Sequence, residues 1–162
     1  MAEGVAEGVS WGDFEAAMPE MASAGRALLF KHGVGLGYLA TIRPNGGPRL
    51  HPFCPIVAVG GLYGFINHHS PKSKDLVRDG RYAIHAFPNG DNDDELSIDG
   101  RAVVVDDPIV IETVRAAYGA TYQTPSEETL FEFRIERALL ALYDAQSTWP
   151  PAYTKWRVTG LV

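Results

Sequence analysis

Four polar side chains near the middle of the chain could together bind an anion: Ser70, Lys72, Ser73 and Lys74. Ser70 is followed by Pro71, which predicts the start of a helix, because serine is a favoured N-cap and proline is tolerated at the first helical position. Lys72 and Lys74 then fall in the first turn, where the helix dipole disfavours each lysine by roughly 0.3–1 kcal/mol. A bound anion would make both lysines favourable at this position. Free backbone N–H groups, hydroxyls and two ammonium groups could then converge on one phosphate.

The alternative is that Lys72 and Lys74 are solvated surface residues, which are common in proteins. The residues alone leave both interpretations open. The net charge of −6 and the pI near 5.3 argue against a general nucleic-acid-binding protein and against binding to an anionic membrane surface. A local cationic site in an acidic protein is therefore a more specific signal.

The predicted helix lies between two predicted strands, residues 62–66 and 81–87, and Gly80 ends it. Apolar or alternating runs bounded by turn residues predict the other strands. These are residues 38–42, 49–59, 96–105 and 129–143. Pro52 and Pro55 would bend the strand at 49–59 and imply an edge or a bulge, because proline cannot donate to the ladder. Asp99-Gly100 marks a further bulge or turn.

Helices are predicted at residues 11–18, from Pro19 to about residue 32, and from a cap at Asp106 or Asp107 to Gly119. Strands joined mainly by hairpins, with few helices, predict a mainly β fold with peripheral helices: a six-stranded antiparallel barrel. Residues 1–10, which repeat Ala-Glu-Gly-Val, are predicted to be a flexible leader. Residues 11–162 are expected to form a single domain.

Other chemistry is poorly supported. The pattern Gly35-x-Gly37-x-x-Ala40 resembles a dinucleotide-binding loop, but it follows a predicted helix and enters a strand, so we interpret these glycines as a close passage of chains. The five histidines lack metal-binding spacing, and no metal site is expected. Cys54 is the single cysteine, which excludes an intrachain disulfide. No signal peptide is visible, and the apolar run 54–66 is too short to span a bilayer, so a cytoplasmic protein is expected.

Four short motifs, in this order and spacing, resemble a known family. They are Leu39-Ala40-Thr41-Ile42-Arg43, Asn45-Gly46-Gly47-Pro48-Arg49, Ser70-Pro71-Lys72-Ser73-Lys74-Asp75-Leu76 and Gly80-Arg81-Tyr82-Ala83. Together they resemble the pyridoxamine 5′-phosphate oxidase-like family, whose fold is the FMN-binding split β-barrel. The resemblance extends over the chain from about Trp11 onward. It implies a homodimer with flavin at the subunit interface.

The resemblance also implies a cofactor site. It assigns to that site Arg49, His51, Pro52, Asn67, Ser70, Lys72, Lys74 and Trp156. Ser70, Lys72 and Lys74 would hold the flavin phosphate, and the segment from Arg49 to Pro52 would lie along the ribityl chain or ring. Asn67 would lie close by, and Trp156 would reach the partner's ring.

The implied function is an FMN-dependent oxidoreductase that acts on an unidentified small molecule. The Arg-x-His type motif of the true oxidase is absent from the C-terminal part, so pyridoxamine phosphate is not the expected substrate. Some relatives bind the deazaflavin F420 and a few bind haem, which leaves an F420-binding reductase or a non-catalytic flavin or haem carrier as alternatives. No catalytic residue is assigned, although Arg49, His51, Lys155 or Arg157 could place a cation near the flavin ring.

Overall fold

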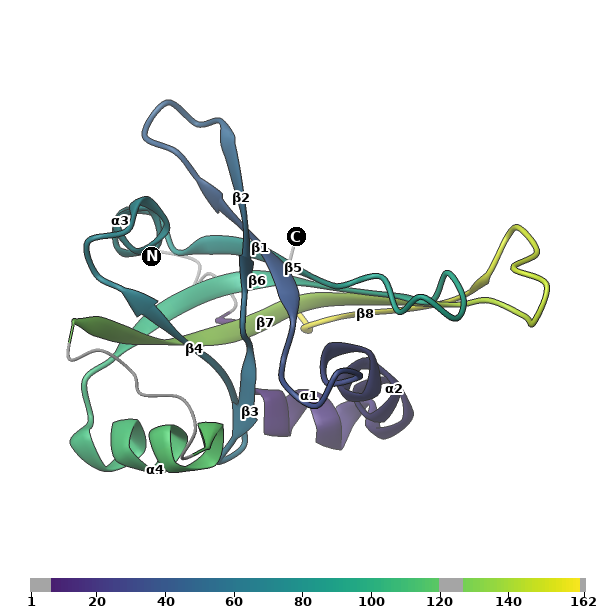
Figure 1. The fold of residues 1–162 in the computed structure, drawn as a ribbon, viewed down its shortest axis with the longest axis horizontal. Coiled ribbons are helices and arrows are strands. Elements are labelled where there is room, and N and C mark those ends of the chain that lie inside the picture. Colours follow the sequence, from purple (N-terminus) through teal and green to yellow (C-terminus); the bar gives the residue numbers. More distant parts are fainter. Residues whose placement is uncertain (1–6, 120–126, 161–162) are drawn as a thin grey trace.

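The computed structural model describes residues 7–119 and 127–160, and its centre is one antiparallel sheet curved into a half-barrel (Figure 1). The sheet has eight strands in the order β2-β1-β5-β6-β7-β4-β3, with β8 pairing β7 beside this path. The strands are β1 (Gly37–Ile42), β2 (Pro48–Phe53), β3 (Ile56–Ala58), β4 (Gly61–Asn67), β5 (Arg81–Ala86), β6 (Glu95–Val105), β7 (Glu128–Leu142) and β8 (Ala152–Arg157). The helices are α1 (Trp11–Ala17), α2 (Pro19–Leu29), α3 (Pro71–Arg78) and α4 (Pro108–Tyr118).

The predicted fold class is confirmed, and the sheet has eight strands where six were predicted. The strand expected at residues 49–59 divides at Cys54-Pro55 into β2 and β3, which lie at the two ends of the strand order. Proline lacks the N–H that a continuous ladder needs, so the chain breaks there and crosses between the two edges. The tail adds β8, which pairs with the second half of β7 after β4 has diverged from it.

The main core is one large buried cluster to which helices and strands both contribute. Large aromatic side chains from helix and strand meet there, and Phe14, Phe53 and Phe133 all belong to one buried cluster. The bulge predicted at Asp99-Gly100 is present, as a shift in the register between β6 and β7. The bulge separates the two halves of β6 and allows the sheet to curve.

The glycines of the rejected dinucleotide pattern are explained by close packing of chains. A Cβ atom on Gly35 would lie 1.9 Å from the carbonyl oxygen of Pro55, and one on Gly37 would lie 3.1 Å from the carbonyl oxygen of His85. Gly37 begins β1 instead of a helix. The interpretation of these glycines as a close passage is confirmed.

The start of the described chain is attached to the sheet. Residues 1–6 of the predicted leader lie outside the described residues. Val9, near the end of that leader, exchanges two backbone hydrogen bonds with Ile135 of β7, and Ser10 caps α1. Among the residues that the structure describes, no helix is long and apolar enough to cross a membrane.

Candidate functional site

The N-terminus of α3 is built by the short turn that precedes it. Oδ1 of Asn67 accepts a hydrogen bond from the His69 N–H at 2.9 Å, and the Asn67 carbonyl accepts one from the Ser70 N–H at 3.0 Å. Oγ of Ser70 then accepts a hydrogen bond from the Ser73 N–H at 3.3 Å and caps the helix. The predicted helix start is confirmed, and no acidic residue lies in its first turn.

Two side chains of β2 lie beside this helix. Arg49, His51 and Phe53 alternate along the strand and share the face that leads into the core, where Phe53 is buried. Nε of Arg49 donates a hydrogen bond of 2.6 Å to Asp75 of α3, which places the strand next to the helix. Burial lowers the pKa of His51 below its usual value, and the charges of Lys72 and then Arg49 lower it further. A neutral imidazole thus lies within electrostatic reach of two cations.

Two groups at this point have no partner within the described part of the chain. Nε2 of His51 is buried and makes no hydrogen bond there. Lys72 is half-buried, its burial lowers the pKa of the ammonium group, and it forms no ion pair with any described carboxylate. A buried polar atom without a partner and a desolvated cation both cost free energy, and an anionic ligand would remove both costs. The residues therefore fit a phosphate-bearing cofactor.

The other predicted phosphate ligand, Lys74, lies on a different side of α3. It is exposed and lines a separate hollow together with His68 and Thr129. Pro52 faces the opposite side of the sheet from His51, where it is exposed and pairs in register with Tyr38. Of the predicted site residues, Arg49, His51 and Lys72 thus lie close together, whereas Lys74 and Pro52 lie apart from them.

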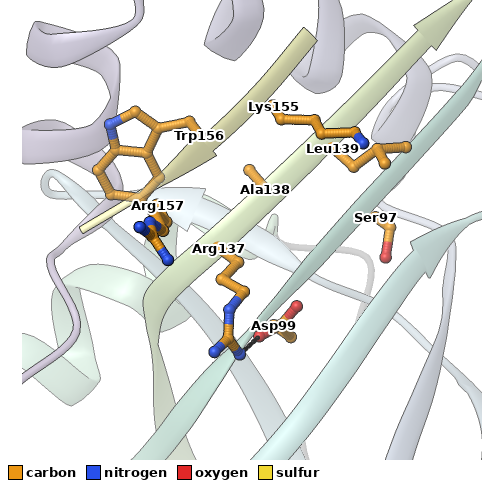
Figure 2. A pocket seen from close by; sticks show the side chains of 8 residues that line it. All are labelled: Ser97, Asp99, Arg137, Ala138, Leu139, Lys155, Trp156 and Arg157. Carbon is orange, nitrogen blue, oxygen red and sulfur yellow. Dashed lines mark hydrogen bonds and ion pairs between the residues drawn. The ribbon is translucent and has the colours of Figure 1, made fainter. Parts of the chain in front are cut away.

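Trp156 belongs to a second region. Its ring packs against Phe14 of α1 at a centroid distance of 5.2 Å. It also lines a depression of about 620 Å³ between β6, β7 and β8, shown in Figure 2. β8 pairs β7, and β1, β5 and β6 lie between β7 and β2 in the sheet. One chain therefore does not bring Trp156 to the α3 site, and a contact with a partner's cofactor stays a prediction.

The same depression is lined by cations from β7 and β8. Its lining includes Arg137, Lys155 and Arg157, and Arg137 forms an ion pair of 3.3 Å with Asp99. Arg137 and Arg157 are opposite each other in the register of β7 and β8. Like charges placed opposite each other on neighbouring strands are unfavourable. The depression can therefore accept negative charge.

Sequence reasoning missed Asp75 as a site residue. This buried carboxylate accepts hydrogen bonds from Thr41, Arg49 and Arg78, which come from β1, β2 and α3. A local signal existed, because Asp75 precedes the buried Leu76 and lies three residues before Arg78. The partners on β1 and β2 could not be found without the tertiary structure. No group of three or more potential metal ligands occurs within residues 7–119 and 127–160.

Comparison with known proteins gives one family and one fold. The family model described as pyridoxamine 5′-phosphate oxidase matches residues 26–141. A haem-binding protein from Mycobacterium smegmatis has a similar structure, with 16% identity, a TM-score of 0.64, and coverage of 83% of this chain and 57% of that protein. This chain therefore spans little more than half the length of that relative.

Two further structures share the fold. A NimC/NimA family protein from Clostridium acetobutylicum has 20% identity and a TM-score of 0.61, with coverage of 82% of this chain and 90% of that one. A protein named F420 reductase has 20% identity and a TM-score of 0.52, with coverage of 64% and 87%. No protein of curated function matches the sequence significantly.

Proposed function

This chain belongs to the pyridoxamine 5′-phosphate oxidase family, and we propose that it is a flavin-dependent oxidoreductase that binds FMN between α3 and β2 and acts on a small molecule. The observation that carries this proposal is the pair of unsatisfied groups at that place. Within the described part of the chain, Nε2 of His51 is buried without a hydrogen bond and Lys72 is half-buried without a counter-ion. A ligand that brings both negative charge and hydrogen-bonding atoms satisfies both groups at once.

Each residue of the proposed site has a distinct role. The free N–H groups of the first turn of α3, together with Ser70 and Lys72, bind the phosphate, and Lys74 approaches it from the other side of the helix. Arg49 and His51, which lie within electrostatic reach of each other and of Lys72, bind the part of the cofactor that follows the phosphate. Asn67 shapes the turn that presents Ser70. When bound, FMN supplies hydride transfer between two substrates, and the chain supplies binding, orientation and charge.

The active form that we propose is a homodimer. The predicted site residues fall into two groups, one at α3 and β2 and one around Trp156 in β8. β8 pairs β7, which is separated from β2 in the sheet by β1, β5 and β6. In a dimer, the cationic depression of one subunit (Figure 2) would meet the cofactor bound by the other. This arrangement would supply the cation near the flavin ring from Lys155 or Arg157.

Two other functions are supported by named structural relatives. The likeness to an F420 reductase favours an F420-dependent enzyme, since F420 also carries a phosphate. The likeness to a haem-binding protein favours a carrier without turnover. The N-terminus of α3 with Ser70 and Lys72 favours FMN over haem, because it suits a phosphate group, which haem lacks.

The deciding measurement is the absorption spectrum of the purified protein, followed by titration of the apoprotein with FMN, F420 and haem. We expect flavin bands, or FMN binding in preference to the other two. A haem spectrum, or failure to bind FMN, would contradict the proposal. Anaerobic stopped-flow mixing of the FMN-loaded protein with NADH, NADPH or reduced F420 then tests turnover. Bleaching of the flavin band supports an enzyme, and an unchanged band with every donor supports the carrier.

A further inference from the structure

Asp75 is a buried carboxylate at the centre of the contact between α3 and the sheet. Only 2% of its side chain is exposed. Oδ2 accepts hydrogen bonds from Oγ1 of Thr41 at 2.9 Å and from Nε of Arg49 at 2.6 Å, while Oδ1 accepts from both terminal nitrogens of Arg78 at 3.2 Å. Burial alone would raise the pKa of Asp75, but these donors hold it below its usual value. The group is therefore an anion with a full set of partners.

The ion pair uses only one edge of the Arg49 side chain. Nε of Arg49 donates to Asp75, and the two terminal nitrogens form no hydrogen bond to any described residue. A guanidinium group is planar, so a partner at Nε fixes the plane in which the terminal nitrogens point. Arg49 also lies within electrostatic reach of His51, whose Nε2 has no partner in the described chain. Asp75 thus fixes the Arg49 side chain and leaves its two terminal nitrogens available to a ligand.

Electrostatics alone does not explain a carboxylate at this place. Asp75 lies in the same helix as Lys72, and a negative charge close to an anion site weakens the binding of the anion. A neutral side chain at position 75 would give a higher anion affinity, so the carboxylate needs another role. The hydrogen bond from Thr41 gives it one such role, since it holds α3 against β1. The hydrogen bond from Nε of Arg49 gives it another, since it connects Asp75 to the proposed site.

We propose that Asp75 is a positioning residue that fixes the guanidinium of Arg49 for contact with the cofactor. This inference rests on the proposed FMN site. Asp75 does not touch the cofactor itself and acts through Arg49. The two explanations differ in sign, because a purely electrostatic Asp75 opposes FMN binding whereas a positioning Asp75 supports it.

A double-mutant cycle on FMN affinity separates these explanations. The apoproteins of the parent, Asp75→Asn, Arg49→Gln and the double variant are titrated with FMN, and quenching of flavin fluorescence is followed. We expect Arg49→Gln to weaken binding about 10- to 100-fold, as for loss of one charge-assisted hydrogen bond, and Asp75→Asn to weaken it about tenfold. In the Arg49→Gln background, Asp75→Asn should no longer weaken binding, and the loss of its negative charge should leave the affinity equal or slightly tighter.

Two further variants separate positioning from a general loss of structure. Arg78→Gln removes another donor to Asp75 and the contact with the Ile42 carbonyl but leaves the Arg49 bond intact. It should lower the melting temperature while FMN affinity stays within about twofold of the parent. Arg49→Lys keeps the charge but loses the planar fork, so it should weaken FMN binding about as much as Asp75→Asn does. Arg78→Gln and Arg49→Lys still test the inference if Asp75→Asn does not fold.

The outcomes are distinct. The inference is overturned if Asp75→Asn binds FMN as tightly as the parent or more tightly, if the losses from Asp75→Asn and Arg49→Gln add, or if Arg78→Gln weakens FMN as much as Arg49→Lys. Failure of the proposed function itself appears earlier and differently, as a parent protein that does not bind FMN, and the inference then fails with it.

Discussion

His51 of β2 and Lys72 of α3 come from separate elements and interact electrostatically at the candidate site. Burial, followed by the charge of Lys72, lowers the pKa of His51. In the unfolded chain the pKa of histidine is about 6.5. Below that pH the unfolded chain takes up a proton that the folded chain resists, so the stability of the fold decreases as the pH falls through this range.

His51→Gln should therefore flatten the pH dependence of stability just below pH 6.5. The variant lacks the titrating group, so its free energy of unfolding should fall less than that of the parent between about pH 6.5 and pH 5. Urea unfolding at several pH values measures this. His32→Gln, at an exposed position after α2, is the matched control and should follow the parent. A His51→Gln profile parallel to that of the parent would contradict the prediction.

Lys72 and Lys74 should differ in their effect on cofactor binding. Lys72 is half-buried beside His51, while Lys74 is exposed in the hollow on the other side of α3. Lys72→Gln should weaken FMN binding roughly 10- to 100-fold, as expected for one charge-assisted hydrogen bond of about 1.5–3 kcal/mol. Lys74→Gln should weaken it less.

The melting temperature of the apoprotein provides the control for both lysine variants. It should be unchanged or slightly higher, because each lysine opposes the helix dipole when no anion is present. Calorimetry on the apoproteins and fluorescence titration with FMN measure the two effects. If the double variant binds FMN as tightly as the parent, the phosphate site is elsewhere.

The dimer should depend on the exposed face of the sheet. Leu50 of β2 is 65% exposed and lies on the same face as its register partner Ala40 and its neighbour Pro52. Leu50→Glu should convert a dimer into a monomer, since a second subunit covering this face would bury the new charge. Ile109→Glu, at a residue of α4 that is 78% exposed, is the matched control and should leave the dimer intact.

Sedimentation velocity at micromolar concentration checks the dimer prediction. The parent and Ile109→Glu should sediment as dimers, and Leu50→Glu as a monomer with unchanged circular dichroism. A parent that is monomeric with FMN bound would overturn the proposed homodimer. A dimeric Leu50→Glu variant would place the interface on another surface.

Gly35→Ala should destabilise the fold without removing the cofactor. Its Cβ would lie 1.9 Å from the carbonyl oxygen of Pro55, so the backbone must shift. Overpacking of this kind typically costs about 1–3 kcal/mol. Urea unfolding should show this loss, while the FMN affinity of the folded variant should match that of the parent. A variant of normal stability that no longer binds a cofactor would favour the rejected dinucleotide loop.

Local chemistry in the sequence was enough to predict much of the fold and one end of the site. Ser70-Pro71 specifies the start of α3, because capping and the fixed φ of proline act within a few residues. The sequence also predicted the helix that ends at Gly119 and limited its cap to Asp106 or Asp107, of which the structure uses Asp107. Order and spacing of short motifs were sufficient to identify the family, which the match over residues 26–141 then showed.

Interactions between distant residues were decided only by the tertiary structure. Arg49 and Asp75 are 26 positions apart, and nothing in either segment requires their contact until β2 lies against α3. The tail was not predicted to be a strand, because the pairing of β8 depends on the free edge of β7 that β4 leaves. Lys72 and Lys74 look equivalent in sequence, yet packing against the sheet half-buries one and leaves the other in solvent. Burial and long-range pairing depend on how the sheet curves, which no short stretch of sequence encodes by itself.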